Sequence, residues 1–488
     1  MTATPAPSAS LALLTDLYQL TMAYGYWKLG RAEHEAVFHL FFRRNPFHGG
    51  YAVAAGLEQA IAFLDNFHFP AEDLTYLAGL TGNDGKPLFE QAFLDYLGEM
   101  RFSCDVDGVP EGTVMYPHAP LLRIKGPIIQ GQLIETPLLN IINFATLIAT
   151  KSARICAAAA GEPVLEFGLR RAQGIDGALS ASRAAYIGGC AATSNCLAGK
   201  RFGIPVKGTH AHSWVMSFAN ETDAFESYAQ AMPNNCVFLV DTYDTVEGVK
   251  LAIEVGKKLR MQGHEMVGVR LDSGDLCALS IAARKLLDAA GFENAAIVAS
   301  NDLDEHRIAE LKRGGATIGV WGVGTRLATA YDQPALGGVY KLAAIRAPGQ
   351  QWSYKVKLSE QAIKVSNPGV QQVRRFSADG KMLADLIYDE DLGVARGGPS
   401  LTDAGKEVPL VPDATSTDLL QEIYRDGRRT YTPPVLSDVR DRTLAQLATI
   451  APKTRDTRAT EIYPVGLEGQ LADLKQSLID AAKPSSAK

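Results

Sequence analysis

The sequence predicts an α/β protein in which a closed barrel of parallel strands occupies the middle of the chain and an α+β domain uses both ends. Three observations lead to this fold class. The chain has 488 residues, more than one hydrophobic core usually holds. Between about residues 162 and 345, short apolar runs ending in Gly, Asp, Ser or Thr alternate with longer helical stretches, which is typical of βαβ units. No GxGxxG motif follows the first run, and polar residues follow nearly every run, as on the rim of a barrel.

The N-terminal part, residues 1–130, mixes two kinds of pattern. Amphipathic stretches such as LEQAIAFLDNF and FEQAFLDYLGEM stand beside strand-like runs such as AVFHLFF. This mixture indicates an α+β domain. The apolar segment 131–155 comes next, and we expect it to form a buried helix that leads into the barrel.

The barrel is expected over residues 131–349. Its strands should end near Glu166, Gly208, Asp241, Leu271, Ser300 and Trp321. The steps of roughly 20 to 40 residues between them suit parallel strands that each need a crossover helix. After about residue 350 the alternation stops, and charged stretches with Pro and Gly, such as DGRRTYTPP, resemble hairpins and turns. We therefore expect residues 350–488 to complete the N-terminal domain.

Composition and charge narrow the range of partners. The chain is 47% hydrophobic and 21% charged, which fits a globular enzyme. With 48 Lys and Arg against 54 Asp and Glu, the net charge is -6, so we expect no nucleic-acid or membrane partner. No apolar run approaches the roughly 18 residues that a membrane span needs, and the chain starts without a basic signal region. The six cysteines form no CxxC pair, which indicates reduced thiols in a cytoplasmic protein.

The first two strand ends carry aromatic, cationic and imidazole groups. In EFGLRR, Phe167 offers a face for a flat anion, and Arg170 or Arg171 offers a guanidinium for a carboxylate or phosphate, although such arginines can equally pair with acids of the next helix. In GTHAHSW, His210 and His212 alternate, and one of them should point inward. A histidine placed there acts in catalysis or fills the core, and metal binding by the pair is a weaker alternative.

Acidic residues follow the next two strands. They are Asp241 in LVDTYD and Asp272 in VRLDSGDL, the latter beside Arg270. Acids in these places can cap helices, but capping leaves Arg270 and Asp272 unexplained. Carboxylates at successive rim positions suit ribose hydroxyls, or Mg²⁺ that is shared with a phosphate.

The last two strand ends are VASNDLDE and VWGVGTRL. In the second, Gly322, Gly324 and Thr325 expose backbone amides that could hold a phosphate, although turns need glycines as well. The predicted rim thus combines an aromatic face, arginines, a histidine, acids and a phosphate nest. This combination suggests a phosphorylated sugar joined to a flat acid.

These motifs, together with TDLYQLTM near the start, resemble the nicotinate phosphoribosyltransferase family, and the resemblance runs from about residue 11 to 345. It implies that nicotinate and phosphoribosyl pyrophosphate (PRPP) give nicotinate mononucleotide and pyrophosphate in NAD biosynthesis. It also implies Mg²⁺ as cofactor and ATP as a co-substrate that is hydrolysed through a phosphohistidine. The implied fold is the irregular α/β barrel of the type II phosphoribosyltransferases with a domain from both chain ends. The implied assembly is a homodimer with shared active sites.

The resemblance assigns four catalytic residues. His212 matches the phosphorylated histidine, and Asp241 matches the carboxylate that orients it. Arg270 matches the arginine near the pyridine carboxylate, and Asp272 the acid that binds the ribose.

Further residues match substrate-binding positions. Phe167 corresponds to the phenylalanine that stacks on the pyridine, Arg170 to a phosphate-binding arginine, and Tyr18 to a tyrosine lent by the partner subunit. The segments that hold the ribose and its 5′-phosphate are matched by Asp302, Gly322, Gly324 and Thr325.

Acceptor choice is expected to depend on GGCAATSNCLAG. The related nicotinamide enzymes carry an aspartate in this stretch, and here Asn195 takes its place. A carboxylate there would repel nicotinate at a cost of a few kcal/mol (about 2–4) in a partly desolvated site. We therefore expect nicotinate as the acceptor. The alternatives are a quinolinate- or nicotinamide-type phosphoribosyltransferase, or a catalytically silent barrel that serves as a scaffold.

Overall fold

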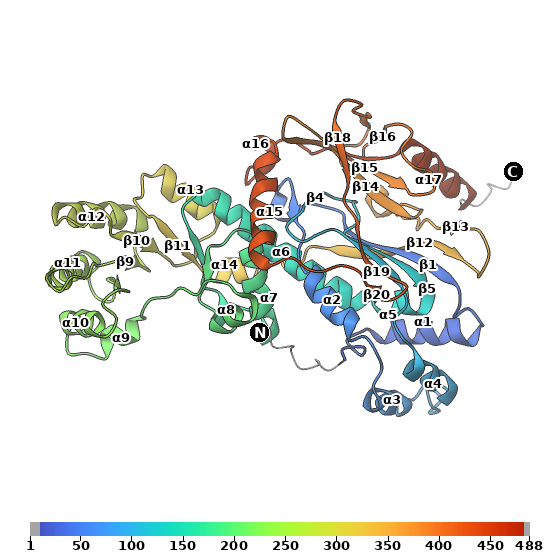
Figure 1. Ribbon diagram of the computed structural model, residues 1–488, viewed down its shortest axis with the longest axis horizontal. Coiled ribbons are helices and arrows are strands. Elements are labelled where there is room, and N and C mark those ends of the chain that lie inside the picture. Colours follow the sequence, from blue (N-terminus) through green and yellow to red (C-terminus); the bar gives the residue numbers. More distant parts are fainter. Residues whose placement is uncertain (1–9, 483–488) are drawn as a thin grey trace. The chain divides into compact units, whose positions relative to one another are not determined.

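The computed structural model describes residues 10–482, and the chain divides into two compact units (Figure 1). The first takes in the chain up to Thr146, Ala335–Val435 and the part from Ala445 onward, and the second Leu147–Pro334 with Leu436–Leu444. The limits expected from the sequence, near residues 130 and 350, both fall inside the first unit. The second unit ends before residue 350 because β12 (Gly338–Arg346) pairs antiparallel with β1 (Glu35–Phe42) and so belongs to the first unit.

The first unit contains a larger antiparallel sheet, a smaller sheet in which only the pair β15 and β21 is parallel, and two short two-stranded pairs. Its other strands are β2 (Ala52–Val53), β3 (Asp105–Gly108), β4 (Val114–Met115), β5 (Leu122–Pro127), β13 (Ser353–Tyr354), β14 (Gln371–Ala378), β15 (Lys381–Asp389), β16 (Gly398–Pro399), β17 (Glu407–Val408), β18 (Thr415–Asp418), β19 (Gln421–Arg425), β20 (Arg428–Arg429) and β21 (Val465–Leu467). Its helices are α1 (Leu17–Lys28), η1 (Pro46–His48), α2 (Leu57–Asp65), α3 (Ala71–Ala78), α4 (Gln91–Glu99), α5 (Ile128–Leu133), η3 (Ala362–Lys364), α16 (Pro452–Arg455) and α17 (Gly469–Ala482). The larger sheet has the order β13-β12-β1-β5-β3-β19-β20 and the smaller one β18-β14-β15-β21. Strands from both chain ends therefore lie in one sheet.

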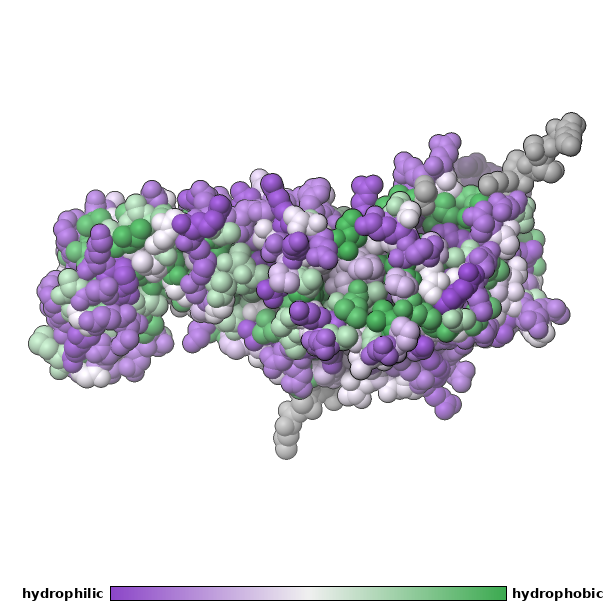
Figure 2. Space-filling model, turned by 90° about the horizontal axis from the view of Figure 1, so that it is seen from above, coloured by the Kyte–Doolittle hydropathy of each residue, from purple (hydrophilic) through white to green (hydrophobic). Residues whose placement is uncertain are grey.

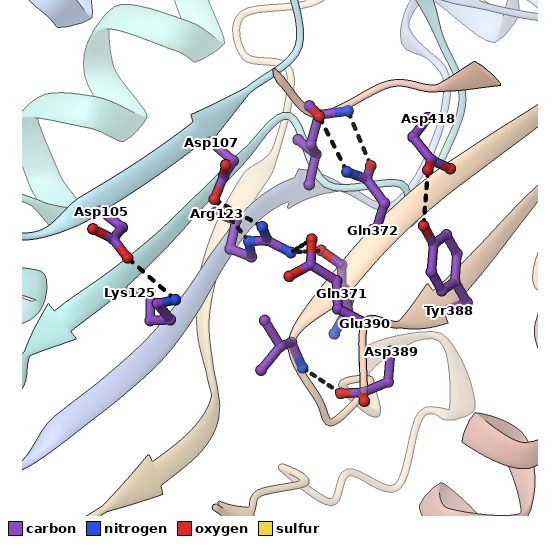
Figure 3. A network of polar contacts seen from close by, with 12 residues as sticks. Asp105, Asp107, Arg123, Lys125, Gln371, Gln372, Tyr388, Asp389, Glu390 and Asp418 are labelled. Carbon is purple, nitrogen blue, oxygen red and sulfur yellow. Dashed lines mark hydrogen bonds and ion pairs between the residues drawn. The ribbon is translucent and has the colours of Figure 1, made fainter. Parts of the chain in front are cut away.

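A buried arginine joins the two sheets of this unit. Arg123 of β5 donates to Asp107 of β3 through Nε at 3.0 Å and Nη2 at 2.8 Å, and to the carbonyl of Gln371 of β14 at 3.0 Å. Figure 3 shows its guanidinium between these groups, with Glu390 at 2.8 Å. The charge is thus paired on every side, as burial requires.

Replacing Arg123 with methionine is expected to lower the free energy of unfolding by about 3–5 kcal/mol, since it leaves the buried carboxylate of Asp107 without its main partner. Urea denaturation measures the loss. Lys125→Met is the matched control, because Lys125 lies two residues further along β5, is 37% exposed and pairs with Asp105 at 3.1 Å. That change should cost less than about 1 kcal/mol. Equal losses in the two variants would contradict the role given to Arg123.

The second unit is built on parallel strands with crossover helices. The strands are β6 (Val164–Glu166), β7 (Ala192–Thr193), β8 (Val237–Leu239), β9 (Gly268–Leu271), β10 (Ala296–Ala299) and β11 (Val320–Val323), in the order β7-β6-β11-β10-β9-β8. The helices are η2 (Leu169–Arg171), α7 (Gly174–Ile187), α8 (Cys196–Phe202), α9 (His212–Met216), α10 (Glu221–Ala231), α11 (Thr245–Met261), α12 (Leu276–Ala289), α13 (Glu305–Arg313) and α14 (Thr325–Ala328). Every strand pair in this sheet is parallel, as the alternating pattern predicted.

The extended segment from Pro205 to His210 contacts both edge strands of this sheet, β7 and β8. On one side, Thr193 of β7 exchanges backbone hydrogen bonds with Pro205 and Lys207, both at 3.0 Å. On the other, the Leu239 N–H of β8 donates to Nε2 of His210 at 3.2 Å. The barrel is therefore closed irregularly, partly through a side chain. The strand expected to end near Gly208 is reduced to one bridge, because Pro205 lacks an N–H for the ladder. The short strand β7 was not anticipated.

Two helices cross the boundary between the units along the chain, α6 (Glu135–Ala159) and α15 (Leu436–Thr449). Among the described residues, α6 alone is long and apolar enough to cross a membrane, but 67% of its most apolar window is buried inside the protein. We assign it as a core helix, in agreement with the buried helix expected over residues 131–155. On the face shown in Figure 2, hydrophilic side chains cover much of the surface.

Candidate active site

Polar side chains gather at the carboxyl edge of the parallel sheet in the second unit. Arg270 lies on β9 and Asp272 directly after it, Asp241 follows β8, Ser300 follows β10 and Phe167 follows β6. The carboxyl ends of parallel strands meet at one edge, and the contacts described below join most of these residues directly. These five residues of the predicted rim therefore lie together at one edge of the sheet.

Two acids of this edge, Asp244 and Asp275, cap helices, whereas the predicted site residues Asp241 and Asp272 do not. Asp244 accepts from the Glu247 N–H of α11 at 2.9 Å, and Asp275 accepts from two backbone N–H groups of α12, each at 3.1 Å. Asp241 and Asp272 precede these caps and have other partners. The sequence left capping and catalysis open for such acids; the structure assigns capping to Asp244 and Asp275, and a catalytic role of Asp241 and Asp272 stays a prediction.

Arg270 is held by three elements. Its Nε donates to Ser300 Oγ at 3.0 Å, its Nη1 to Thr209 Oγ1 at 3.1 Å and its Nη2 to Asp272 Oδ1 at 3.2 Å. The guanidinium carbon lies 5.8 Å from the ring centroid of Phe167. A fixed cation therefore faces an aromatic ring, an arrangement that suits a flat anion.

The two acids of the site differ in their surroundings. Asp241 is buried, and its Oδ2 accepts from the Asp272 N–H at 2.8 Å and from Ser273 Oγ at 2.6 Å. The side chain of Asp272 is 26% exposed and accepts from both Arg270 and Ser300. Asp241 thus fixes the loop after β9, while Asp272 is accessible to a ligand.

His212 opens helix α9 beside these acids. Its Nδ1 lies 3.1 Å from Thr242 Oγ1, whereas its Nε2 lies 3.7 Å from Asp272 Oδ2 and 4.0 Å from Asp241 Oδ1. The side chain is 39% exposed. The carboxylates favour an N–H on Nε2, which leaves the Nδ1 lone pair to face the Thr242 hydroxyl. Asp241 therefore acts on the ring through its charge across 4.0 Å.

His210 has a structural place. It is 8% exposed, accepts the hydrogen bond from Leu239 and packs against Tyr228, with ring centroids 4.8 Å apart. Burial lowers its pKa below the usual value, so the ring is neutral. The sequence could not decide between the two histidines; burial and the contact with β8 separate them.

Phe167 and Gly322 fit together. A side chain on Gly322 would begin 2.8 Å from the Phe167 ring, so this glycine makes room for the aromatic face. Gly322 therefore has a packing role, and its expected part in a phosphate nest stays a prediction. Arg170 and Arg171 follow on η2, both exposed, and within residues 10–482 neither has an ion-pair partner.

Asn195 is 2% exposed and lies in a buried polar network. Its Oδ1 caps α8 by accepting from the Ala198 N–H at 3.1 Å, and its Nδ2 donates to Ser182 Oγ at 3.1 Å. Ser182 and Thr193 lie 2.9 and 2.6 Å from Glu166, which also accepts from a backbone N–H next to Phe167. The contacts of Asn195 are thus with the protein, whereas direct contact with the acceptor was expected from the sequence.

The remaining predicted residues lie in three places. Asp302 has a positive φ of 47°, directly after Asn301 with 88°, so the loop after β10 is locally strained, which is common at functional sites. Gly324 precedes α14 and Thr325 begins it. Tyr18 belongs to α1 of the first unit and is 50% exposed.

Sequence reasoning missed the hydroxyl groups that hold the charged residues. They are Thr209, Thr242, Ser273 and Ser300. Each stands within a quoted motif, one or two positions from a residue that was considered, and this position could have identified them. Glu221, discussed below, carried no such signal.

The fold and the site together indicate a phosphoribosyltransferase. The chain has the fold of the type II phosphoribosyltransferases, since it matches the crystal structure of nicotinate-nucleotide pyrophosphorylase from Pyrococcus furiosus with a TM-score of 0.69 over 95% of this chain and 100% of that chain. The identity is 21%, so this likeness concerns the fold alone. Three family models then cover the sequence: the nicotinate phosphoribosyltransferase N-terminal domain at residues 13–143, the nicotinate phosphoribosyltransferase family at 163–363, and its C-terminal domain at 371–475. The chain belongs to the nicotinate phosphoribosyltransferase family.

Individual relatives support this family assignment. The chain is 44% identical over 485 residues to a nicotinate phosphoribosyltransferase of Bacillus subtilis, covering 97% of this chain and 96% of the relative. It is 36% identical to the human one, with 98% of each chain covered. The crystal structure of human nicotinic acid phosphoribosyltransferase matches with a TM-score of 0.83 over 95% of this chain and 99% of that chain, at 34% identity.

Proposed function

We propose that this enzyme transfers the phosphoribosyl group of PRPP to nicotinate in NAD biosynthesis and couples the transfer to ATP hydrolysis through a phosphohistidine at His212. Family membership supports the transfer. The observation that carries the coupling is the placement of His212, half-exposed at the strand ends with two carboxylates on one ring nitrogen and a hydroxyl on the other.

Nicotinate would lie on the ring of Phe167, with its carboxylate toward Arg270. The fixed guanidinium supplies charge-assisted hydrogen bonds without having to reorganise. The pyridine nitrogen carries its own lone pair, so no side-chain base is needed. The protein's task is to align that nitrogen with the anomeric carbon of the sugar.

The sugar phosphate would occupy the neighbouring rim. Asp272 and Asp302 are proposed to bind the ribose hydroxyls, with Arg170 and the backbone of Gly324 and Thr325 on phosphate groups. The exposure of Asp272 and the unpaired state of Arg170 among the described residues support these roles.

The geometry favours Nδ1 of His212 as the phosphoryl acceptor. Its lone pair would attack the γ-phosphorus of ATP, the bond to the bridging oxygen would break, and ADP would leave. The N–H on Nε2 would stay, and Asp241 and Asp272 would stabilise the positive charge that the ring gains.

The family implies Mg²⁺, but within residues 10–482 no three His, Cys, Asp or Glu side chains converge to hold a metal ion. Mg²⁺ would arrive on the oxygens of pyrophosphate or ATP, which is its usual mode of binding.

Two further properties belong to the proposal. Tyr18 would be lent to the site of a second copy in a homodimer, in keeping with its exposed position on α1. The protein would work in the cytoplasm, where the six free cysteines stay reduced.

A product assay tests the activity. Nicotinate and PRPP should give nicotinate mononucleotide, with more product when ATP is present. Nicotinamide and quinolinate are the competing acceptors. Use of either at least as well as nicotinate would refute the assigned substrate. Calorimetric titration with PRPP tests the scaffold alternative, because a catalytically silent scaffold would bind no PRPP and release no heat.

Replacing Asn195 with aspartate is expected to destabilise the protein by about 1–3 kcal/mol, because the single hydroxyl proton of Ser182 cannot serve the introduced carboxylate and that of Glu166 together. Thermal unfolding measures this loss. Since the side chain is buried, the activities with nicotinate and nicotinamide should fall together. A changed preference between them at unchanged stability would show that residue 195 contacts the acceptor after all.

A further inference from the structure

Glu221 is a buried acid next to the proposed phosphohistidine site. It is the first residue of α10 and is 8% exposed. Phe225 and Tyr228 follow on the same helical face, and both pack against His210, with ring centroids 6.2 and 4.8 Å apart. His210 also accepts from the Leu239 N–H of β8, so this packing brings α10 to the end of β8, which Asp241 and Asp244 follow.

Two carboxyl oxygens are left unpaired here. Oε1 of Glu221 and Oδ1 of Asp241 are both buried, and neither has a hydrogen-bond partner within the described part of the chain. Asp241 receives two hydrogen bonds on its other oxygen, which stabilise its ionised form. No donor among residues 10–482 contacts Oε1 of Glu221. Two neighbouring buried carboxyl groups rarely ionise together, so the one that receives no stabilising hydrogen bonds keeps a proton.

We propose that Glu221 is a positioning residue that holds a proton beside Asp241 and so limits the negative charge that faces His212. The inference rests on the proposed phosphohistidine. Phosphorylation brings a negatively charged phosphoryl group to the ring, and any further negative charge nearby opposes it. A neutral Glu221 therefore favours phosphorylation, and an ionised Glu221 disfavours it.

The surroundings make this proton responsive near neutral pH. Burial raises the pKa of Glu221 to about 7, and the charges of Asp241 and Asp244 add to the rise. Other titratable groups nearby are His212, which begins α9, His210 before it, and Tyr228 on α10 itself. On α11, Glu247 is exposed and pairs with Lys250 at 2.6 Å, so it contributes little. As the pH rises through 7, the amount of phosphohistidine should decline.

Glu221→Gln tests this role, because glutamine keeps the shape and the donor of a protonated carboxyl but cannot ionise. Phosphate incorporation from γ-labelled ATP is measured between about pH 6 and pH 8.5. The wild type should lose about five- to tenfold over this range, the effect of one added charge, while the variant should stay level. Glu226→Gln is the matched control on the same helix, where Glu226 is exposed and pairs with Lys258, and it should follow the wild type.

The outcomes separate the two proposals. If the wild type takes up no acid-labile phosphate, the phosphohistidine itself is refuted. If it does, and Glu221→Gln keeps the wild-type pH dependence, only the role of Glu221 is refuted. A second test uses the wild type and so does not depend on whether the Glu221→Gln variant folds. In protein labelled with [5-¹³C]glutamate, one carboxyl carbon should titrate near pH 7. A spectrum in which all glutamates titrate near their ordinary value of about 4.3 would overturn the inference.

Discussion

Replacing His212 with alanine is expected to abolish ATP-dependent phosphate incorporation and the stimulation of nucleotide synthesis by ATP, while some ATP-independent transfer remains. The reason is that His212 is the exposed imidazole at the strand ends, whereas Arg270 and Phe167, which are proposed to hold nicotinate, do not depend on it. Incubation with γ-labelled ATP, followed by acid treatment, measures the labile phosphate. A parallel assay of nicotinate mononucleotide with and without ATP measures the coupling.

Two other histidines serve as controls. His264→Ala changes an exposed histidine that contacts Asn234 at 2.8 Å, and it should leave labelling and coupling intact. His210→Ala removes the acceptor of the Leu239 N–H, so it should lower the stability by about 1–3 kcal/mol and yet allow labelling of His212. Undiminished labelling of the His212→Ala variant would refute the assignment.

Replacing Arg270 with methionine is expected to lower kcat/KM for nicotinate by about 10²–10³-fold. Removing one member of a desolvated charge pair costs about 2–5 kcal/mol, and each 1.4 kcal/mol is about tenfold. The preference for nicotinate over nicotinamide should shrink as well, because the uncharged amide gains less from the guanidinium. Steady-state kinetics with both acceptors measure the two effects.

The Arg270→Lys variant should recover little of the kcat/KM for nicotinate that Arg270→Met loses. Arg270 uses three nitrogens at once, toward Ser300, Thr209 and Asp272, and a single ammonium group cannot reproduce that fork. Arg307→Lys is the matched control, because Arg307 is exposed and pairs with Glu310 within its own helix. If Arg270→Lys kept the full kcat/KM for nicotinate, a point charge would be sufficient and the proposed fork would be unnecessary.

Much of the site could be predicted because its residues are local to strand ends. Arg270 and Asp272 are neighbours in VRLDSGDL, and the alternation of strand and helix brings such motifs to one edge without knowledge of side-chain packing. The parallel sheet and the buried helix after residue 130 follow in the same way, because hydrophobic periodicity is a property of short windows.

Other features depend on residues far apart in the chain. Asn195 stands in a motif that suggested contact with the acceptor, but its amide is occupied by Ala198 and Ser182. The close fit of Gly322 against the ring of Phe167 joins two motifs that are far apart in the sequence, and no pattern indicated it. Glu221 stood out in no pattern, since its burial depends on how α10 packs.

By itself, the sequence determined the class of fold, the order of the chemical groups along the rim and the family, because these are written in consecutive residues. The tertiary structure decided which histidine is available and which carboxyl group has no partner. Those outcomes depend on burial and on hydrogen bonds between residues some thirty positions apart, such as His210 with Leu239 and Asp241 with Asp272. Such contacts arise only when the barrel closes.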